Sequence, residues 1–214
     1  AGGRAASAAA TTAAARDRGR RAAPSNARLA SRPVSGAKTL PQLCAAVQAG
    51  ASCMGADDWA AAYGALARLY RGCTMQLQDD IGAGAVRAQR QAVRLELVLP
   101  AATALHAQVP RLAGHMLPRH ASQALWSMSV AHCYERAVFD TLCMRCVDGA
   151  DDMAPHECAM AMLAFGRLRH YHPELLRLVP QVMLRELGRA SPADTSCVLW
   201  GYAALRIPGM PCKP

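Results

Sequence analysis

Three segments of the sequence decide the fold: Pro118-Arg119-His120-Ala121-Ser122-Gln123-Ala124-Leu125-Trp126, Pro155-His156-Glu157-Cys158-Ala159-Met160-Ala161-Met162-Leu163 and Pro192-Ala193-Asp194-Thr195-Ser196-Cys197-Val198-Leu199-Trp200. Successive prolines are 37 residues apart, and the column formed by Trp126, Leu163 and Trp200 has the same spacing. A fixed period of about 20–50 residues is typical of a repeat array. The alternative is a plain helical bundle with coincidental spacing, but two columns agree over all three segments, which favours the repeat.

Each segment has the pattern of an amphipathic helix. Proline suits the first helical position because the N–H that it lacks has no partner there, and Ser191 before Pro192 is a good N-cap. Large apolar residues recur three and four apart, as in Met162, Phe165 and Leu168, and form one helical stripe. The small residues between them let a neighbouring helix approach closely.

A second apolar helix follows each of the first two segments, over Val138–Cys146 and Leu175–Leu187. The unit is therefore a helical hairpin of about forty residues, and adjacent hairpins must stack to bury their apolar faces. Abundant alanine and few β-branched residues also favour helix. We predict an all-α fold: an α-solenoid of stacked helix-turn-helix repeats with a 37-residue period and an extended basic N-terminal tail.

The predicted organisation has three parts: a basic extension over 1–38, diverged helical hairpins over 39–117, and regular repeats over 118–214 that begin at 118, 155 and 192. In the middle part, Gly64–Leu69 aligns with Trp200–Leu205 and indicates an earlier, diverged segment. We expect a short helix over 39–51, an irregular stretch with a loop and a helix over 71–100, and a second helix over 101–109.

The sequence after Leu205 differs from that after the earlier segments. It carries Pro208, Pro211 and Pro214, so the final hairpin has no second helix of its own. This hairpin is either capped by a partner or cut short.

The positive charge is concentrated in the first forty residues. They carry +7 of the formal net charge of +9, which leaves +2 for the other 174 residues. A segment rich in Arg, Ala and Ser and poor in acid is typical of an organelle transit peptide. A retained segment of this composition cannot fold alone. Ordering by a polyanion is then expected, because each neutralised phosphate releases a counterion; a solvated tail is the alternative. The basic residues are Arg4, Arg16, Arg18, Arg20, Arg21, Arg28, Arg32 and Lys38, against Asp17.

The end of the third segment carries a family likeness. Leu199-Trp200-Gly201-Tyr202-Ala203-Ala204-Leu205 resembles the Leu-Trp-Ala-Leu-Ala-Lys-Leu core of octotricopeptide repeats, which are related to the repeats of FAST-kinase-like proteins. Leu125–Ser129 and Leu163–Leu168 resemble it less closely, and Leu163 replaces the tryptophan. The likeness covers about residues 110–210, and residues 41–70 more weakly. Repeats of this family are about 38 residues long and abundant in green algae.

The resemblance implies an RNA-binding α-solenoid of an organelle. Members of the family act in RNA maturation or translation, or belong to the algal mitochondrial ribosome, where they hold fragmented ribosomal RNA. This array is short and has a basic arm, which fits a ribosomal component better than a free factor. Its expected partners are ribosomal RNA, or another organellar RNA, and neighbouring ribosomal proteins. The expected location is the mitochondrion, with the chloroplast as the alternative.

Candidate RNA-binding residues lie near the start of the first helix of each hairpin. In such solenoids, polar residues at this place line the concave face. Arg119, His120, Gln123 and His156 are predicted to stack on bases or hydrogen-bond to them. A second set of basic residues is predicted to contact phosphates, together with those of the tail. For any single residue, a solvated polar face is the simpler interpretation, so the hypothesis rests on the set. The second set is Arg136, Arg145, Arg167, Arg169, Arg177, Arg185 and Arg189.

The sequence offers little for catalysis or metal binding. Cys143 and Cys146 form one C-x-x-C pair, but no second pair at zinc-site spacing follows, and both fit an apolar helix face. His156-Glu157 lacks the second histidine of a zincin motif. We expect a non-enzyme without metal, cofactor, small-molecule substrate or membrane span, whose nine cysteines are reduced core thiols.

The prediction from sequence is therefore a non-catalytic RNA-binding helical-repeat protein that stabilises ribosomal RNA in an organellar ribosome. A protein–protein scaffold of a large organellar complex is the alternative from another class, because the repeat region carries little net charge. A free organellar RNA maturation or translation factor is the third possibility.

Overall fold

The protein is all-α in the part that the computed structural model describes, residue 34 and residues 36–80 and 83–206, and this part contains no β-strand. The predicted all-α class is confirmed. The main helices are α3 (Leu40–Gly50), α4 (Ala56–Asp80), α5 (Ala83–Val93), α6 (Leu99–His106), α7 (Val109–Leu112), α8 (Pro118–Ala131), α9 (Arg136–Asp148), α10 (Pro155–Leu168), α11 (Pro173–Arg185) and α12 (Pro192–Leu205).

Shorter helical pieces connect these helices. A π-helical segment, Arg94–Val98, joins α5 to α6. A single 3-10 turn precedes each of α4, α8, α10 and α12. These turns are η1 (Ala51–Cys53), η3 (Ala113–His115), η4 (Ala150–Asp152) and η5 (Leu187–Arg189).

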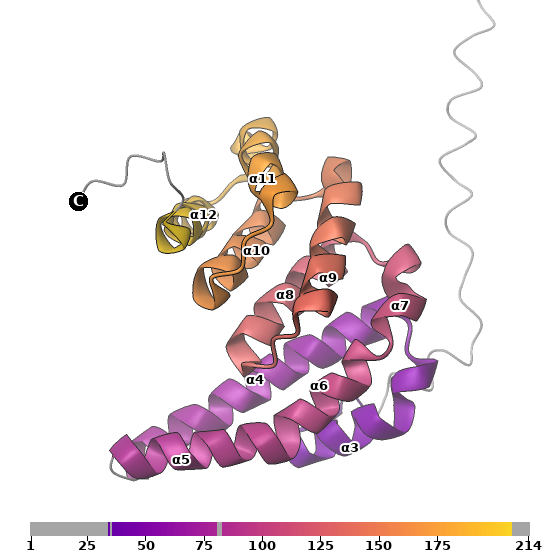
Figure 1. Ribbon diagram of the computed structural model, residues 1–214, viewed down its shortest axis with the longest axis vertical. Coiled ribbons are helices and arrows are strands. Elements are labelled where there is room, and N and C mark those ends of the chain that lie inside the picture. The colour runs from indigo at the N-terminus through magenta and orange to yellow at the C-terminus, as the bar shows by residue number, and fades with distance from the viewer. Residues whose placement is uncertain (1–33, 35, 81–82, 207–214) are drawn as a thin grey trace, which may run out of the picture.

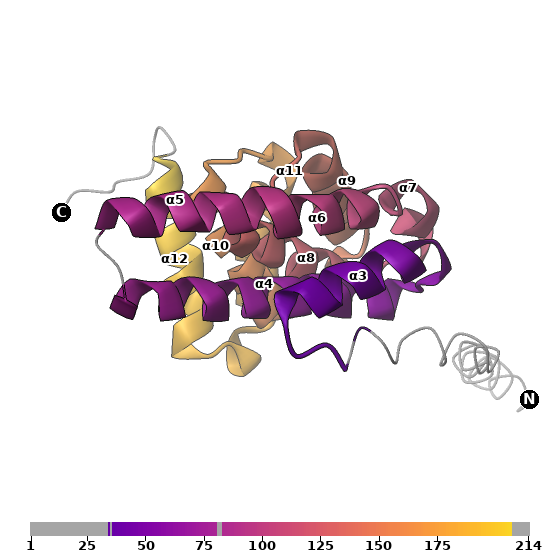
Figure 2. The same ribbon diagram turned by 90° about the horizontal axis from the view of Figure 1, so that it is seen from below.

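The helices form two layers (Figure 1). Helices α4, α8, α10 and α12 lie side by side in that order, each packed against the next. Helices α9 and α11 pack on α8 and α10 and on each other. At the other end, α3 packs on α4 and α6, and the rod formed by α5, the π segment and α6 runs alongside α4 (Figure 2). The core lies between the layers.

Proline begins α8, α10 and α12, each of which is 14 residues long. The third helical side chain then accepts a hydrogen bond from the backbone N–H before the proline, which is one half of a capping box. In α12 the Ser191 hydroxyl also accepts from the Asp194 N–H, at 3.1 Å. The shared bonds are Leu117 N–H to His120 Nδ1 (3.2 Å), Ala154 N–H to Glu157 Oε2 (2.8 Å) and Ser191 N–H to Asp194 Oδ2 (3.0 Å).

The same three helices end alike. Each is followed by a non-glycine residue in the left-handed conformation, which closes a helix by returning an N–H to its last carbonyls. These residues are His132, Arg169 and Arg206, with φ of 54°, 52° and 49°.

Glycines bring α10 and α12 into close contact. A Cβ at Gly201 would lie 2.5 Å from the Met162 carbonyl oxygen, and one at Gly166 would lie 2.7 Å from the Trp200 ring. Real Cβ atoms do not approach so closely, so only glycine permits this spacing. Trp200 therefore faces back toward α10.

A tyrosine of α12 compensates for the hydrogen bond that a proline inside α11 removes. Pro180 has no N–H, so the Leu176 carbonyl four residues earlier loses its intrahelical donor. The Tyr202 hydroxyl donates to that carbonyl at 2.5 Å. Burial raises the pKa of Tyr202 to about 12, with a further contribution from Cys158, so the hydroxyl keeps its proton at neutral pH.

The N-terminal half departs from the expectation for residues 71–100. Helix α4 continues to Asp80, and most of the stretch expected to be irregular is helical. The alignment of Gly64 with Trp200 agrees with the helix starts, because each is the ninth residue of its helix; a Cβ at Gly64 would lie 2.4 Å from Gln123 Nε2 of α8. The short helix expected over 39–51 is confirmed as α3 and buries Leu43 and Val47.

The described cysteines form no disulfide and most are buried. Burial raises the pKa of Cys143 and Cys146 far above the usual thiol range, and that of Cys158 to about 12. These thiols are packing groups in the core. Among the described residues, no helix combines the length and apolar character that a membrane span requires.

Candidate nucleic-acid interface

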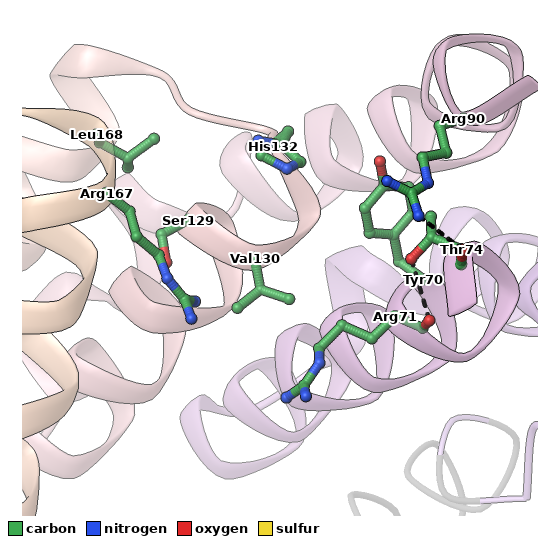
Figure 3. A pocket seen from close by; sticks show the side chains of 9 residues that line it. All are labelled: Tyr70, Arg71, Thr74, Arg90, Ser129, Val130, His132, Arg167 and Leu168. Atoms are coloured by element: carbon green, nitrogen blue, oxygen red, sulfur yellow. Dashed lines mark hydrogen bonds between the residues drawn. The ribbon is translucent and has the colours of Figure 1, made fainter. Parts of the chain in front are cut away.

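An open groove runs where α4 and α5 face α8 and α10. It consists of two adjoining pockets of about 460 and 610 Å³, which share Arg71. Figure 3 shows the first pocket, with side chains converging from both sides. The first pocket is lined by Tyr70, Arg71, Thr74, Arg90, Ser129, Val130, His132, Arg167 and Leu168, and the second by Ala61, Gly64, Ala65, Arg68, Arg71, Gly72, Met75, Gln123 and Trp126.

The groove is positively charged, and none of the described residues that line the two pockets is acidic. Arg68, Arg71 and Arg167 are exposed, and none forms an ion pair with a side chain that the structure describes. Arg90 is fixed to the wall, because its Nη2 donates to the Thr74 carbonyl at 3.0 Å. Exposed, unpaired guanidinium groups favour an anionic ligand.

Two ionisable residues beside these arginines, His132 and Tyr70, have shifted pKa values. Burial lowers the pKa of His132, and the charges of Arg94 and Arg167 lower it further. Burial raises the pKa of Tyr70, while Arg94 and Arg90 oppose that rise. Near neutral pH, His132 is therefore a neutral ring, able to donate one hydrogen bond and accept another.

Flat and apolar groups lie beside the arginines. Trp126, which is partly exposed, and Met75, which is largely exposed, both line the second pocket. Gln123 also lines this pocket, close against Gly64. In the first pocket, the edge of the Tyr70 ring meets His132, with ring centroids 6.2 Å apart. Aromatic faces next to cationic groups suit unstacked bases.

Two residues predicted from sequence lie in the groove, Gln123 and Arg167. Arg119, His156, Arg169 and Lys38 are exposed but line neither pocket. Arg119 pairs with Asp57 at 3.3 Å. The tail residues Arg4, Arg16, Arg18, Arg20, Arg21, Arg28 and Arg32 lie outside the described part of the chain.

The assignment of His120 to base recognition does not fit the structure. The side chain is buried, with 5% of its surface exposed. The Leu117 N–H donates to its Nδ1 at 3.2 Å, and its Nε2 lies 2.8 Å from Asp57 Oδ1 and 3.1 Å from Arg119 Nε. Both ring nitrogens are engaged in joining α8 to the start of α4.

The predicted phosphate contacts of Arg145 and Arg185 do not fit the structure either. Arg145 Nη2 donates to the Met116 carbonyl at 3.1 Å, and Nη1 pairs with Asp148 at 2.9 Å. Arg185 Nη2 donates to backbone carbonyls of η4, and its Nη1 pairs with Asp151 at 3.5 Å. These guanidinium groups hold the backbone and have little capacity left for phosphate.

Sequence reasoning missed Arg68, Arg71, Arg90 and His132. Arg68 and Arg71 are three residues apart and therefore share one face of α4. Only the assembled fold brings them opposite Arg167, whose helix lies about a hundred residues later.

Two further histidine–carboxylate pairs lie outside the groove. His106 Nδ1 lies 2.8 Å from Glu135, and His170 Nε2 lies 3.1 Å from Asp140. Burial lowers the pKa of both histidines, and their acidic partners oppose this. Within the described residues, no group of three or more His, Cys, Asp or Glu side chains is placed to hold a metal ion.

Neither the known protein-family models nor the curated protein sequences include a match to this chain.

Proposed function

We propose that this protein is a non-catalytic RNA-binding protein whose groove between α4 and α10 holds a single-stranded segment of RNA. The observation that carries this proposal is the set of Arg68, Arg71 and Arg167, which are exposed and have no acidic neighbour among the described residues that line the pockets. Double-stranded RNA is a poorer fit, because its bases are stacked and out of reach of Trp126 and His132.

The helix arrangement supports an α-solenoid as the architecture of this binding surface. Helices α8, α10 and α12 begin 37 residues apart, have equal lengths and end in the same conformation. In a solenoid each unit contacts its neighbours, and the inner helices line one extended surface. The groove lies at the end of that surface where α4 is longer than the other inner helices.

We further propose that the protein is a structural component of an organellar ribosome, with the mitochondrion as the first choice and the chloroplast as the second. Few hairpins give little room for sequence-specific reading of RNA, whereas permanent contact with one ribosomal RNA needs charge and shape more than sequence recognition. The arginine-rich tail would add phosphate contacts. A scaffold role is the second candidate, favoured by the exposed Leu199 on α12.

The test compares two triple variants of the full chain with the same net charge. The groove variant carries Arg68→Ala, Arg71→Ala and Arg167→Ala; the control carries Arg136→Ala, Arg177→Ala and Arg189→Ala, which lie outside both pockets. Binding to a fluorescent single-stranded RNA is measured by anisotropy over a range of salt concentrations. Three lost phosphate contacts reduce the log–log salt slope by about 2 and weaken binding at least about tenfold.

The control variant is expected to bind nearly as the natural chain does. Equal losses in the two variants would show that the RNA contacts the surface at large, through net charge alone. Absence of RNA binding by the natural chain would refute the proposed function.

A further inference from the structure

Helices α8, α10 and α12 lie side by side in one row and run parallel (Figure 1). In α10 and α12, Met162 lies against Gly201, and Gly166, four residues later, lies against Ala204. Helices α8 and α10 both end at the first pocket of the groove. The three helices therefore begin at one edge of the row, the N-terminal edge, and end at the other, the C-terminal edge.

The two edges differ in charge. At the N-terminal edge, acidic residues lie just before α10 and α12 or in their first turns. These residues are Asp151, Asp152, Glu157, Glu186 and Asp194. At the C-terminal edge, the last turn of each helix and the residue after it, over 128–132, 165–169 and 202–206, contain no acid. They contain His132, Arg167, Arg169 and Arg206, so the C-terminal edge is positively charged.

Three of these four residues occupy an unusual backbone position. His132, Arg169 and Arg206 follow their helices with positive φ, and all three are exposed. Glycine is the usual residue there, because a side chain disfavours the left-handed conformation. A cation gains some stability from the helix dipole, but this gain is no larger than the conformational cost. Helix stability alone therefore does not favour arginine over glycine at these positions.

The guanidinium groups at the C-terminal edge are also free to bind an anion. Arg169 and Arg206 form no ion pair and no side-chain hydrogen bond with any residue that the structure describes. By contrast, Arg185 and Arg189, close to the N-terminal edge, both pair with Glu186. An exposed guanidinium without an acidic partner suits a phosphate.

The C-terminal edge continues the groove. Arg167 and Leu168 line the first pocket, and Arg169 follows them directly in the chain. Arg206 occupies the position of Arg169 one helix further along the row, and packed helices are about 8–10 Å apart. A strand that leaves the first pocket along this edge therefore meets Arg169 and then Arg206.

We propose that the bound single strand of RNA extends beyond the groove along the C-terminal edge of α8, α10 and α12, where Arg169 and Arg206 each bind one of its phosphates. This inference rests on the proposed function and adds the course of the strand. The RNA crosses the row from α4 towards α12 at the ends of the helices. The acidic N-terminal edge repels it, so only one edge of the row binds RNA.

The alternative role of these arginines is to cap their helices, and Arg169→Gly combined with Arg206→Gly separates the two roles. Glycine suits positive φ, so this double variant should melt no lower than the natural chain. Binding is measured by anisotropy with fluorescent oligouridylates of about 4 to 16 nucleotides, the usual size of single-stranded sites.

The shortest RNA fits within the groove and should bind the natural chain and the glycine variant equally. The longest should bind the variant about tenfold more weakly, because two phosphate contacts are lost. The log–log salt slope for that RNA should decrease by about 1.4, since each contact to a single strand contributes about 0.7. Arg169→Lys with Arg206→Lys keeps the charge and should restore the binding of the long RNA.

The matched control is Arg136→Ala with Arg177→Ala, two exposed arginines of the outer helices α9 and α11. It has the same net charge as the glycine variant and should bind RNA of every length as the natural chain does. An equal loss in the control would overturn the inference, because net charge alone would then explain the binding.

Three other results would also overturn it. If the glycine variant binds long RNA as tightly as the natural chain, the arginines only cap their helices and the groove proposal stands. If it loses affinity equally for the shortest and the longest RNA, the two arginines belong to the groove and the strand does not extend past it. If the natural chain binds no RNA of any length, the proposed function fails as well.

Discussion

Two prolines interrupt helical rods in the two halves of the molecule, and each half accommodates its proline differently. In the C-terminal half, Pro180 deprives the Leu176 carbonyl of its donor, and the Tyr202 hydroxyl of a neighbouring helix replaces it. In the N-terminal half, Pro100 follows the π segment, where the Leu99 N–H bonds to the Arg94 carbonyl five residues earlier. The carbonyl four residues before Pro100 belongs to Glu96, which is exposed to water.

The contrast teaches where this fold depends on tertiary partners. The C-terminal hairpins are packed so closely that a missing hydrogen bond must be supplied by a side chain of the next helix. The long rods of the N-terminal half extend past the hairpins, and water can satisfy their backbone. Helices α4 and α5 therefore extend far enough to place Arg71 and Arg90 in the groove. The C-terminal half provides the stacked hairpins, and the N-terminal half provides most of the residues that line the candidate site.

The largest expected effect tests the close packing of the C-terminal half. Gly201→Val places side-chain atoms against the Met162 carbonyl and should lower the free energy of unfolding by about 3 kcal/mol, because α10 and α12 must move apart. Urea denaturation measures this. The matched control is Gly188→Val, because a Cβ at that glycine meets nothing within 4 Å. Equal losses at the two positions would contradict the contact as described.

The next effect tests the tyrosine that compensates for Pro180. Tyr202→Phe leaves the Leu176 carbonyl buried and unpaired, which should cost about 1–2 kcal/mol. The same substitution in a Pro180→Ala background should cost much less, since the new N–H reaches the carbonyl within the helix. A double-mutant cycle by urea denaturation gives the coupling. Additive losses would show that the hydroxyl and the proline are not linked.

The smallest effect is expected in the N-terminal half. Pro100→Ala restores an N–H four residues after Glu96, an exposed residue, and improves helix propensity, so the free energy of unfolding should rise by less than about 1 kcal/mol. Thermal and urea unfolding measure the change. A loss larger than that caused by Tyr202→Phe would reverse the comparison, because the π segment would then depend on the proline for its packing.

The candidate site was only partly predictable, for reasons that differ from residue to residue. Arg167 and Gln123 could be proposed because they lie on helices with a clear apolar stripe, so their polar faces follow from the pattern. His120 lies on the same helix as Gln123, but its ring caps α8 and contacts Asp57 of α4, a residue 63 positions away in sequence. Arg71 gave no signal, because α4 begins at Ala56 and lacks the proline that begins the other inner helices.

The sequence by itself determined that the chain is helical and where α8, α10 and α12 begin, because proline, small residues and apolar spacing act within one or two helical turns. Only the tertiary structure decided which arginines are unpaired and which hold backbone carbonyls. Arg145 and Arg167 look alike in sequence, yet one donates to Met116 and the other lines the groove. The reason is that a guanidinium group finds its partner through space, and the partner lies on a helix that local sequence does not specify.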